Sequence, residues 1–216
     1  MSERHAIAHT LRRRLRIVFT GAQRQPDGPI DTAAAQPDLS LAGYSEDCRF
    51  SGRVRLDGER LSDMLNAYDE FQLVDTQVEG LDGRLFEVGE LVVTRDELLA
   101  VHASGPRGNP GRRTRTHAHA VLIQSGPYVI RGYLHVLPGA DPMASARRRR
   151  PMVPLTNAWV EYAVGGALCH SELGTIVVNR ETADWMRLAS DAEVAFPEAW
   201  VAEPASVADG RRTVSS

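Results

Sequence analysis

The stretch 121–134, VLIQSGPYVIRGYL, predicts two β-strands joined by a tight turn. Apolar, β-branched and aromatic residues lie on both sides of a Ser-Gly-Pro break at residues 125–127, and this pattern is typical of a β-hairpin. The segments 154–160 and 174–181 then predict a third and a fourth strand, with Trp185, Met186 and Leu188 beyond them. This half of the chain therefore predicts a small antiparallel β-unit.

The same order of segments occurs earlier in the chain, which indicates an internal repeat. Gly52 and Leu73 are 21 residues apart, and Gly132 and Leu155 are 23 residues apart. The small length differences fall where loops are expected. We therefore predict two copies of one β-unit. The matched blocks are 48–56 with 128–136, 71–78 with 153–160, and 91–96 with 176–181.

These blocks resemble the Sm-like family, the small β-barrels that include bacterial Hfq. The first motif of that family is an apolar strand, a Gly turn and a strand with a second Gly. Gly126 and Gly132 match this motif in the second copy, and Gly52 matches its second Gly in the first copy. The resemblance implies a mainly β fold, with two five-stranded antiparallel barrels in tandem and a helix before the first.

The second family motif, an apolar pair followed by Arg-Gly in a sharp turn, is matched by residues 93–96 and 178–181 except for the Gly. The arginines of the motif are Arg95 and Arg180. Taken together, the two motifs extend the resemblance over about residues 13–22, 47–103 and 119–190. The segment 60–66 is not usual in the family.

The departures from the family pattern concern the RNA site. In Sm-like proteins this site combines an Asn of the first motif with the Arg of the second. Here the Asn position falls near Glu70 and Met152, and the Gly after the Arg is replaced by Asp96 and Glu181. A carboxylate next to a phosphate or base pocket opposes nucleic-acid binding. The sequence therefore favours the fold over the family's uridine pocket.

Composition places the chain among globular proteins without a strong charge preference. It has 216 residues, 43% of them hydrophobic, and a formal net charge of −3. All 25 basic residues are Arg, for which a coding bias is a simpler explanation than selected anion binding. Its 2 cysteines, Cys48 and Cys169, fall at unmatched positions of the two copies, so we expect free thiols.

The expected organisation follows from the repeat and from the segments around it. No stretch reaches the length of a membrane span, and the apolar run after residues 12–14 is too short for a secretory signal, so we predict a cytoplasmic protein. We also expect a helix at 3–14, a first strand at 15–20, a short helix at 60–68, a closing strand at 97–102 and a loop at 140–150. The predicted domains are a first Sm-like domain at 1–103 with an insertion at 21–46, a linker at 104–118, a second domain at 119–196 and a flexible tail at 197–216.

Two arginine-rich stretches are candidate binding sites. One is in the predicted loop of the second copy, and the other is in the linker. Either could hold phosphates or an acidic partner, but neither has the neighbouring aromatics of a single-strand stacking platform. Solvated loops are the alternative. The candidate binding residues, with the two motif arginines, are Arg147, Arg148, Arg149, Arg150, Arg112, Arg113, Arg115, Arg95 and Arg180.

Other side chains with chemical potential are better explained as structural. His117 and His119 would share a face of a strand, but no carboxylate or Cys lies at ligand spacing beside them. Asp63, Asp69 and Glu70 do not have the calcium-loop pattern. No nucleophile elbow and no Gly-rich phosphate loop is present. We therefore expect neither a cofactor, nor a metal, nor enzymatic activity.

Two classes of function remain. One is a non-enzymatic scaffold or assembly subunit that binds proteins through barrel edges and loops, as a homo-oligomer or within a larger complex. The other is an RNA-binding or regulatory protein of the Hfq type. Exposed strand edges are templates for another chain, so we favour the first class, and we expect the insertion and the loop at 147–150 to carry partner contacts.

Overall fold

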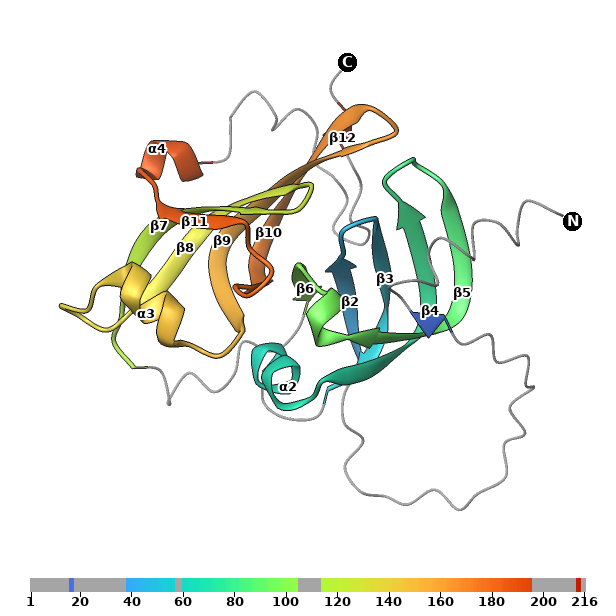
Figure 1. Ribbon diagram of the computed structural model, residues 1–216, viewed down its shortest axis with the longest axis horizontal. Helices are drawn as coiled ribbons and strands as arrows, with labels where there is room; N and C mark the ends of the chain where they lie inside the picture. Colours follow the sequence, from blue (N-terminus) through green and yellow to red (C-terminus); the bar gives the residue numbers. More distant parts are fainter. Residues whose placement is uncertain (1–15, 18–37, 57–59, 105–113, 196–212, 215–216) are drawn as a thin grey trace, which may run out of the picture.

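A computed structural model describes residues 16–17, 38–56, 60–104, 114–195 and 213–214. Figure 1 shows two lobes of β-structure with strand β6 between them. We call residues 38–104 the first half and residues 114–195 the second half. In the described ranges no helix is long and apolar enough to cross a membrane.

Each half has the same order of elements: a hairpin, a short helix, a second hairpin, a turn and a last short strand. In the first half these are β2 Asp38–Tyr44, β3 Cys48–Arg55, α2 Leu61–Ala67, β4 Glu70–Gly80, β5 Leu85–Thr94, the 3-10 turn η1 Arg95–Glu97 and β6 Ala100–Ser104. In the second half they are β7 His117–Ser125, β8 Tyr128–Val136, α3 Pro142–Arg148, β9 Met152–Val164, β10 Ala167–Asn179 and β11 Trp185–Leu188, followed by α4 Asp191–Val194. Two very short strands, β1 Arg16–Ile17 and β12 Thr213–Val214, pair with β5 and β10.

The strand order is also the same in the two halves. It is β5-β4-β3-β2-β6 in the first half and β10-β9-β8-β7-β11 in the second, so the last strand of each half pairs with its first strand. The mainly β class predicted from the sequence is confirmed. The expectation of two separate barrels is not met, because β6 pairs with β10 of the other half and joins everything into one open antiparallel sheet.

The glycines of the first motif explain a kink that the halves share. The pairing of β3 with β4 shifts register around Gly52, and the pairing of β8 with β9 shifts around Gly132. A Cβ added to Gly52 would lie 2.8 Å from the Thr76 hydroxyl, and one added to Gly132 would lie 3.0 Å from the Cβ of Ala158. The first distance is too short for a side chain and the second would force the neighbouring strand to shift, so Gly lets the strands come this close.

A second shared feature lies on the partner strands, opposite these bulges. Asp75 in β4 and Asn157 in β9 occupy matched positions and have positive φ angles of 51° and 45°. Asp and Asn tolerate this left-handed conformation better than other residues with a side chain. In the first half, the Arg53 Nε donates to the Asp75 carboxylate at 2.9 Å. The bulge is therefore built into both halves by residue type.

The two hydrophobic cores exchange residues where the halves meet. Tyr44, Leu99 and Ala100 of the first half pack in the core of the second half. Met152 and Val177 of the second half pack in the core of the first. The contact between β6 and β10 is therefore part of the hydrophobic core and not a surface contact.

The first strand was predicted in the wrong place. It is β2, Asp38–Tyr44, and not 15–20, so the predicted insertion at 21–46 is wrong over its last part. Leu39 and Leu41 are buried, but the small residues between and after them gave the segment the composition of a loop. Gly43 is needed because a Cβ there would overlap the ring of Phe50. Residues Arg16–Ile17 lie instead at the outer edge of β5.

Several smaller boundaries also differ from the prediction. The expected loop at 140–150 contains helix α3, which matches α2 in length and place. The closing strand begins at Ala100, after the turn η1, and the first strand of the second half begins at His117, inside the predicted linker. In the expected tail, Thr213–Val214 pairs with β10. The predicted helix at 3–14, Arg112 and Arg113 lie outside the described residues.

Candidate functional site

The two arginines of the second motif occupy equivalent turns. The backbone N–H of Arg95 donates to the carbonyl of Asp69 at 2.7 Å, and that of Arg180 donates to the carbonyl of Pro151 at 2.9 Å. In each half this bond fixes the turn after the fourth strand against the residue that precedes the third strand. The same backbone geometry therefore presents both arginine side chains.

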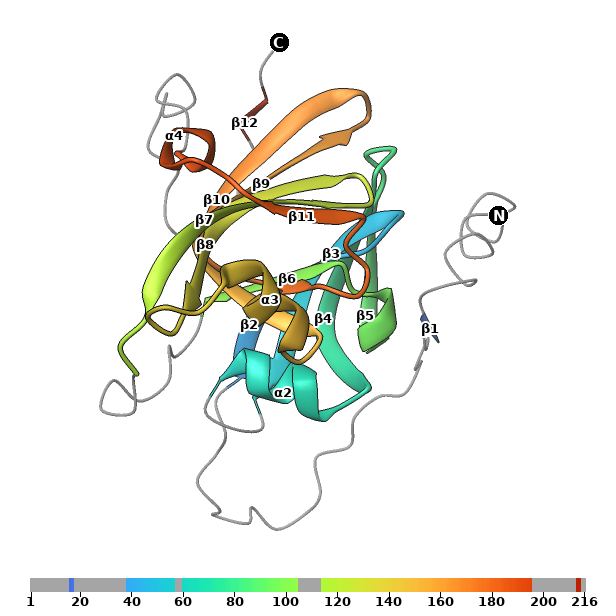
Figure 2. The ribbon, with the colours of Figure 1, turned by 60° about the vertical axis from the view of Figure 1, so that its left-hand side comes forward.

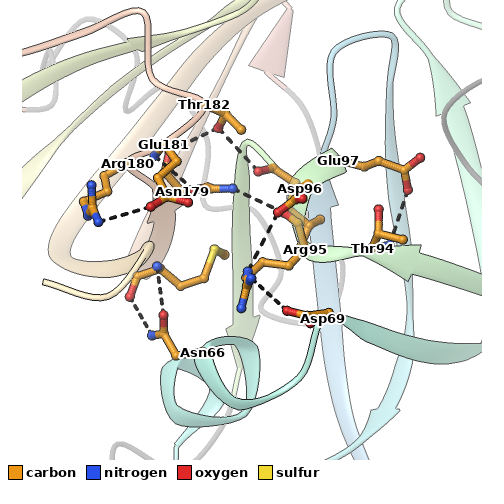
Figure 3. Close-up of polar contacts among 12 residues, drawn as sticks. Asn66, Asp69, Thr94, Arg95, Asp96, Glu97, Asn179, Arg180, Glu181 and Thr182 are labelled. Carbon is orange, nitrogen blue, oxygen red and sulfur yellow. Dashed lines mark hydrogen bonds and ion pairs between the residues drawn. The ribbon is translucent and has the colours of Figure 1, made fainter.

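These arginine side chains are already engaged within the protein. Arg95 pairs with the Asp69 carboxylate at 2.8 Å, and its side chain is 21% exposed. Arg180 pairs with Glu181 at 3.2 Å and donates from Nε to the carbonyl of Arg149 at 2.9 Å. Figure 3 shows both groups next to carboxylates. The local negative charge opposes the binding of a phosphate at either turn.

The two turns also contact each other across the contact between the halves. Asn179 donates from its side-chain amide to the carbonyl of Arg95 at 3.3 Å, and its backbone N–H donates to the carbonyl of Leu99 at 2.9 Å. Thr182 donates from its hydroxyl to the carbonyl of Leu98 at 3.5 Å. We call this contact region, made of β6, β10 and the two turns, the junction.

Asn66 forms a second polar link at the junction. Its amide nitrogen donates to the carbonyl of Met152 at 3.0 Å, and its amide oxygen accepts from the Met152 N–H at 3.1 Å. Figure 3 shows this pair of bonds between α2 and the start of β9. A side-chain amide that satisfies both backbone polar groups of one residue fixes that strand end in place.

Three tyrosines and an arginine fill the apolar side of the junction. Tyr44 lies edge-on to Tyr128, with ring centroids 5.3 Å apart, and Tyr128 and Tyr162 are 5.6 Å apart. The guanidinium of Arg49 lies 4.9 Å from the Tyr162 ring centroid and donates to its hydroxyl. Burial raises the pKa of Tyr44 and raises that of Tyr162 to about 12. The tyrosines and Arg49 hold the halves together. Tyr44 and Tyr162 remain uncharged phenols at neutral pH.

The thiol of Cys48 lies beneath the same cluster. Its backbone carbonyl accepts from the Tyr128 hydroxyl at 3.2 Å, and its side chain is fully buried. Burial raises the pKa of the Cys48 thiol to about 11. A thiol that stays protonated is a poor nucleophile. Cys48 and Cys169 are both free and buried, as the sequence predicted for free thiols.

A shallow hollow of about 360 Å³ opens beside the junction. Five carboxylate residues line it, and together they make it acidic. It could accept a cationic side chain, but among the described residues no group of His, Cys, Asp and Glu is arranged to hold a metal ion. The acidic residues are Glu46, Asp47, Asp96, Glu97 and Asp184.

The arginine run of the second half lies at the end of α3. Arg147, Arg148 and Arg150 are exposed, while Arg149 is half-buried and donates to the carbonyl of His135. The carbonyl of Arg149 accepts from Arg180. The structure thus brings one residue of the run to a motif arginine and leaves three in solvent. Arg115 is exposed before β7 and is not part of this group.

Apart from the two-residue strand β1, the sheet ends in two outer edges, β5 and β11. Among the described residues, the outer side of β5 is paired with β1 at Val92 and Leu91. On β11, Trp185 is 44% and Leu188 is 47% exposed. Figure 2 shows that the long β9–β10 hairpin extends beyond the rest of the sheet. Exposed apolar residues on a strand that is paired on one side only are typical of a binding edge.

Asn66, Asn179 and Tyr44 were not singled out as functional residues in the sequence. Asn179 lies inside a matched block, so its position was visible but its partner was not. Asn66 lies within the short helix predicted at 60–68, but its contact with Met152 spans 86 positions. Only the pairing of β6 with β10 brings these residues together.

Comparisons with protein-family models, with curated proteins and with solved structures gave no match to this chain.

Proposed function

We propose that this chain is a non-enzymatic assembly subunit made of two Sm-like units, which binds other protein chains by strand addition at its outer edges, β5 and β11. Strand addition places a strand of one protein beside the edge strand of another and uses backbone hydrogen bonds for affinity. The proposal combines the resemblance of the motifs with the strand order of each half, in which the last strand pairs with the first.

The junction is the single observation that carries the proposal. Inside the chain, the last strand of one unit, β6, pairs antiparallel with the fourth strand of the other, β10. The outer edges are the same two kinds of strand: β5 matches β10, and β11 matches β6. The chain therefore contains one example of the contact that its two outer edges are shaped to make.

Exposure distinguishes the used edges from the unused ones. Ala100 and Val101 on β6 are both fully buried, whereas the residue that matches Ala100 on β11 is Trp185, at 44% exposure. Val177 on β10 is 3% exposed, while its match on β5, Val92, is only half-buried. A protein strand laid on these edges would bury the same positions that the junction already buries.

The alternative, an Hfq-type RNA-binding protein, receives less support from the geometry. The motif arginines are paired with carboxylates, and the position of the family's Asn is held by Glu70 in one half and by the buried Met152 in the other. Three exposed arginines lie in the run 147–150, at the end of α3 and just after it. The run itself contains no aromatic residue. Binding of a single strand relies on such stacking surfaces.

The test is whether complexes depend on the outer edge. We would measure the solution mass of the purified chain, and the complexes that a tagged chain recovers from native lysate, for the wild type and for Trp185→Asp. Leu137→Asp is the matched control, because Leu137 is 57% exposed and lies outside β11. We expect Trp185→Asp, but not Leu137→Asp, to lose the complexes. A monomer that recovers no edge-dependent complex would refute the proposal.

A further inference from the structure

The residues at the two outer edges differ from their matches at the junction in a consistent way. At the junction, Asn66 of α2 contacts the backbone of Met152, the first residue of β9. Asn66 is the sixth residue of its seven-residue helix and follows buried Leu65; Arg147 is the sixth residue of seven-residue α3 and follows buried Ala146. The match of Met152 is Glu70, the first residue of β4.

The residues that correspond to Asn66 and Met152 are therefore Arg147 and Glu70, which carry opposite charges and lie at opposite ends of the molecule. Arg147 lies on the side of β11, and Glu70 lies on the side of β5. Both are exposed, and neither forms an ion pair with another described residue. If β11 of one chain lay on β5 of another as β6 lies on β10, these two residues would face each other.

A second contact of the junction involves a side chain and a backbone carbonyl. At the junction, His102 of β6 lies 2.9 Å from the carbonyl of Thr175, the residue before Ile176 in β10. Counting from the motif arginines, His102 matches Arg187 and Thr175 matches Glu90. Arg187 now pairs with Glu193 at 2.7 Å, and Glu90 accepts from Gln72 at 2.8 Å. In the same docking, the Arg187 side chain would lie near the backbone carbonyl of Glu90, on the same face of the sheet as Leu91.

We propose, on the basis of the assembly function above, that the partner is a second copy of this chain, docked head to tail with β11 on β5 and selected by the pair Arg147–Glu70. The register copied from the junction places Trp185 opposite Val93, Met186 opposite Val92 and Arg187 opposite Leu91. Charges at a contact select the partner and its register more than they add affinity.

The apolar part of the contact is weaker at the outer edges than at the junction. Tyr44 and Leu99 of the first half are matched by Gln124 and Asp184 in the second. Such polar residues beside an edge strand restrain unspecific pairing. The copy–copy contact therefore depends on the backbone ladder, on Trp185 and on the Arg147–Glu70 ion pair, and it should weaken as salt screens exposed charges.

In a single chain, β1 lies where β11 of the second copy would lie. Arg16 is paired with Val92 and Ile17 with Leu91, and these are the positions that the copied register assigns to Met186 and Arg187. Docking must therefore displace β1 from the edge. The described part of β1 pairs at two residues and the junction ladder at three, so a docked copy would offer this edge one more paired residue.

Charge reversal tests this inference. Glu70→Arg and Arg147→Glu each create like charges at the contact, and we expect each to weaken self-association about tenfold. Mixing the two variants restores opposite pairs at both kinds of contact, so the mixture should regain the wild-type mass. Glu172→Arg and Arg115→Glu, which change exposed charges elsewhere, are the matched controls. Circular dichroism and the midpoint of thermal unfolding check that each variant folds.

The outcomes separate this inference from the proposed function. Self-association that is unchanged by the two reversals, or not regained on mixing, would overturn the charge pairing and leave edge binding intact. A wild-type chain that stays monomeric while it recovers other proteins through β11 would overturn the second copy as partner but support edge binding. A monomer with no edge-dependent complex would refute both.

Discussion

Asn66 and Met152 hydrogen-bond to each other twice, although they belong to different halves of the chain. The amide of Asn66 also donates to the carbonyl of Ser62 at 2.7 Å, so α2 and β9 are held by one side chain. This contact orients the start of β9, and with it Val153 and Leu155 of the second core.

We predict that Asn66→Ala destabilises the protein by about 1–3 kcal/mol, because the backbone N–H and carbonyl of Met152 both lose their partner. The free energy of unfolding in urea measures the effect. Gln72→Ala, which removes an exposed side-chain hydrogen bond to Glu90, is the control and should cost less. Equal effects of the two changes would mean that the Asn66 contact is not special.

We predict that Gly132→Ala destabilises the protein by about 1–3 kcal/mol, since the added methyl group would overpack the bulge. It would lie 3.0 Å from the Cβ of Ala158 and 3.2 Å from that of Leu155. Ala158→Gly in the same chain removes the closer atom and should recover part of the loss. Additive effects of the two changes in the thermal unfolding midpoint would contradict this explanation.

We predict that stability falls between about pH 9 and pH 11 through Cys48. Burial raises the pKa of this thiol from 9.0 to about 11, so the folded state holds the proton more tightly than the unfolded state. The contribution is complete below pH 9 and is lost as pH rises through 11, by roughly 2–3 kcal/mol in total. Urea unfolding at several pH values should give a shallower decline for Cys48→Ala. Parallel declines would rule out Cys48 as the source. Above pH 10 the raised pKa of Tyr162 also lowers the stability as pH rises, in both proteins.

We predict that locking β1 on β5 prevents self-association. Arg16→Cys with Val92→Cys places two thiols at directly opposed positions of an antiparallel pair, and the natural cysteines are buried. The oxidised double variant should be monomeric by light scattering and should associate again on reduction. The single variant Val92→Cys, treated in the same way, is the control. Association of the oxidised form would show that β1 does not compete for this edge.

We predict that uridine-rich RNA at physiological salt binds no better than the non-specific range of roughly 10⁻⁴ to 10⁻⁶ M. The carboxylates beside Arg95 and Arg180 are the reason. Fluorescence anisotropy with labelled RNA measures this binding, and Arg95→Ala should leave it unchanged. Tight, saturable binding that Arg95→Ala abolishes would instead favour the Hfq-type function.

The matched blocks predicted where most strands of both halves lie, because their β-branched residues and glycines act locally. The predicted strand at 71–78 falls within β4 and its match within β9 for this reason. The strand Asp38–Tyr44 was missed because Ser40, Ala42 and Gly43 are small, and their place in the sheet depends on neighbours such as Phe50. Local pattern cannot show such a dependence.

The candidate site was only partly predictable. The motif arginines were located correctly in equivalent turns, since a sharp turn after a strand has a local signature. The pairing of Arg95 with Asp69 was not foreseen, and the roles of Asn66 and Tyr44 depend on contacts between distant halves. The fusion of two expected barrels into one sheet has the same cause: β6 found its partner in β10, about 75 residues further along.

The pairing of β6 on both of its sides has a consequence for how the molecule could be divided. β2 and β10 each hydrogen-bond to β6, so the sheet joins the halves independently of the chain between Ser104 and His117. A backbone cut in that segment removes no described strand pair, and it leaves two fragments with complementary surfaces. The two halves are in this sense complementary fragments on one polypeptide, and either one alone would expose the core residues that the junction buries.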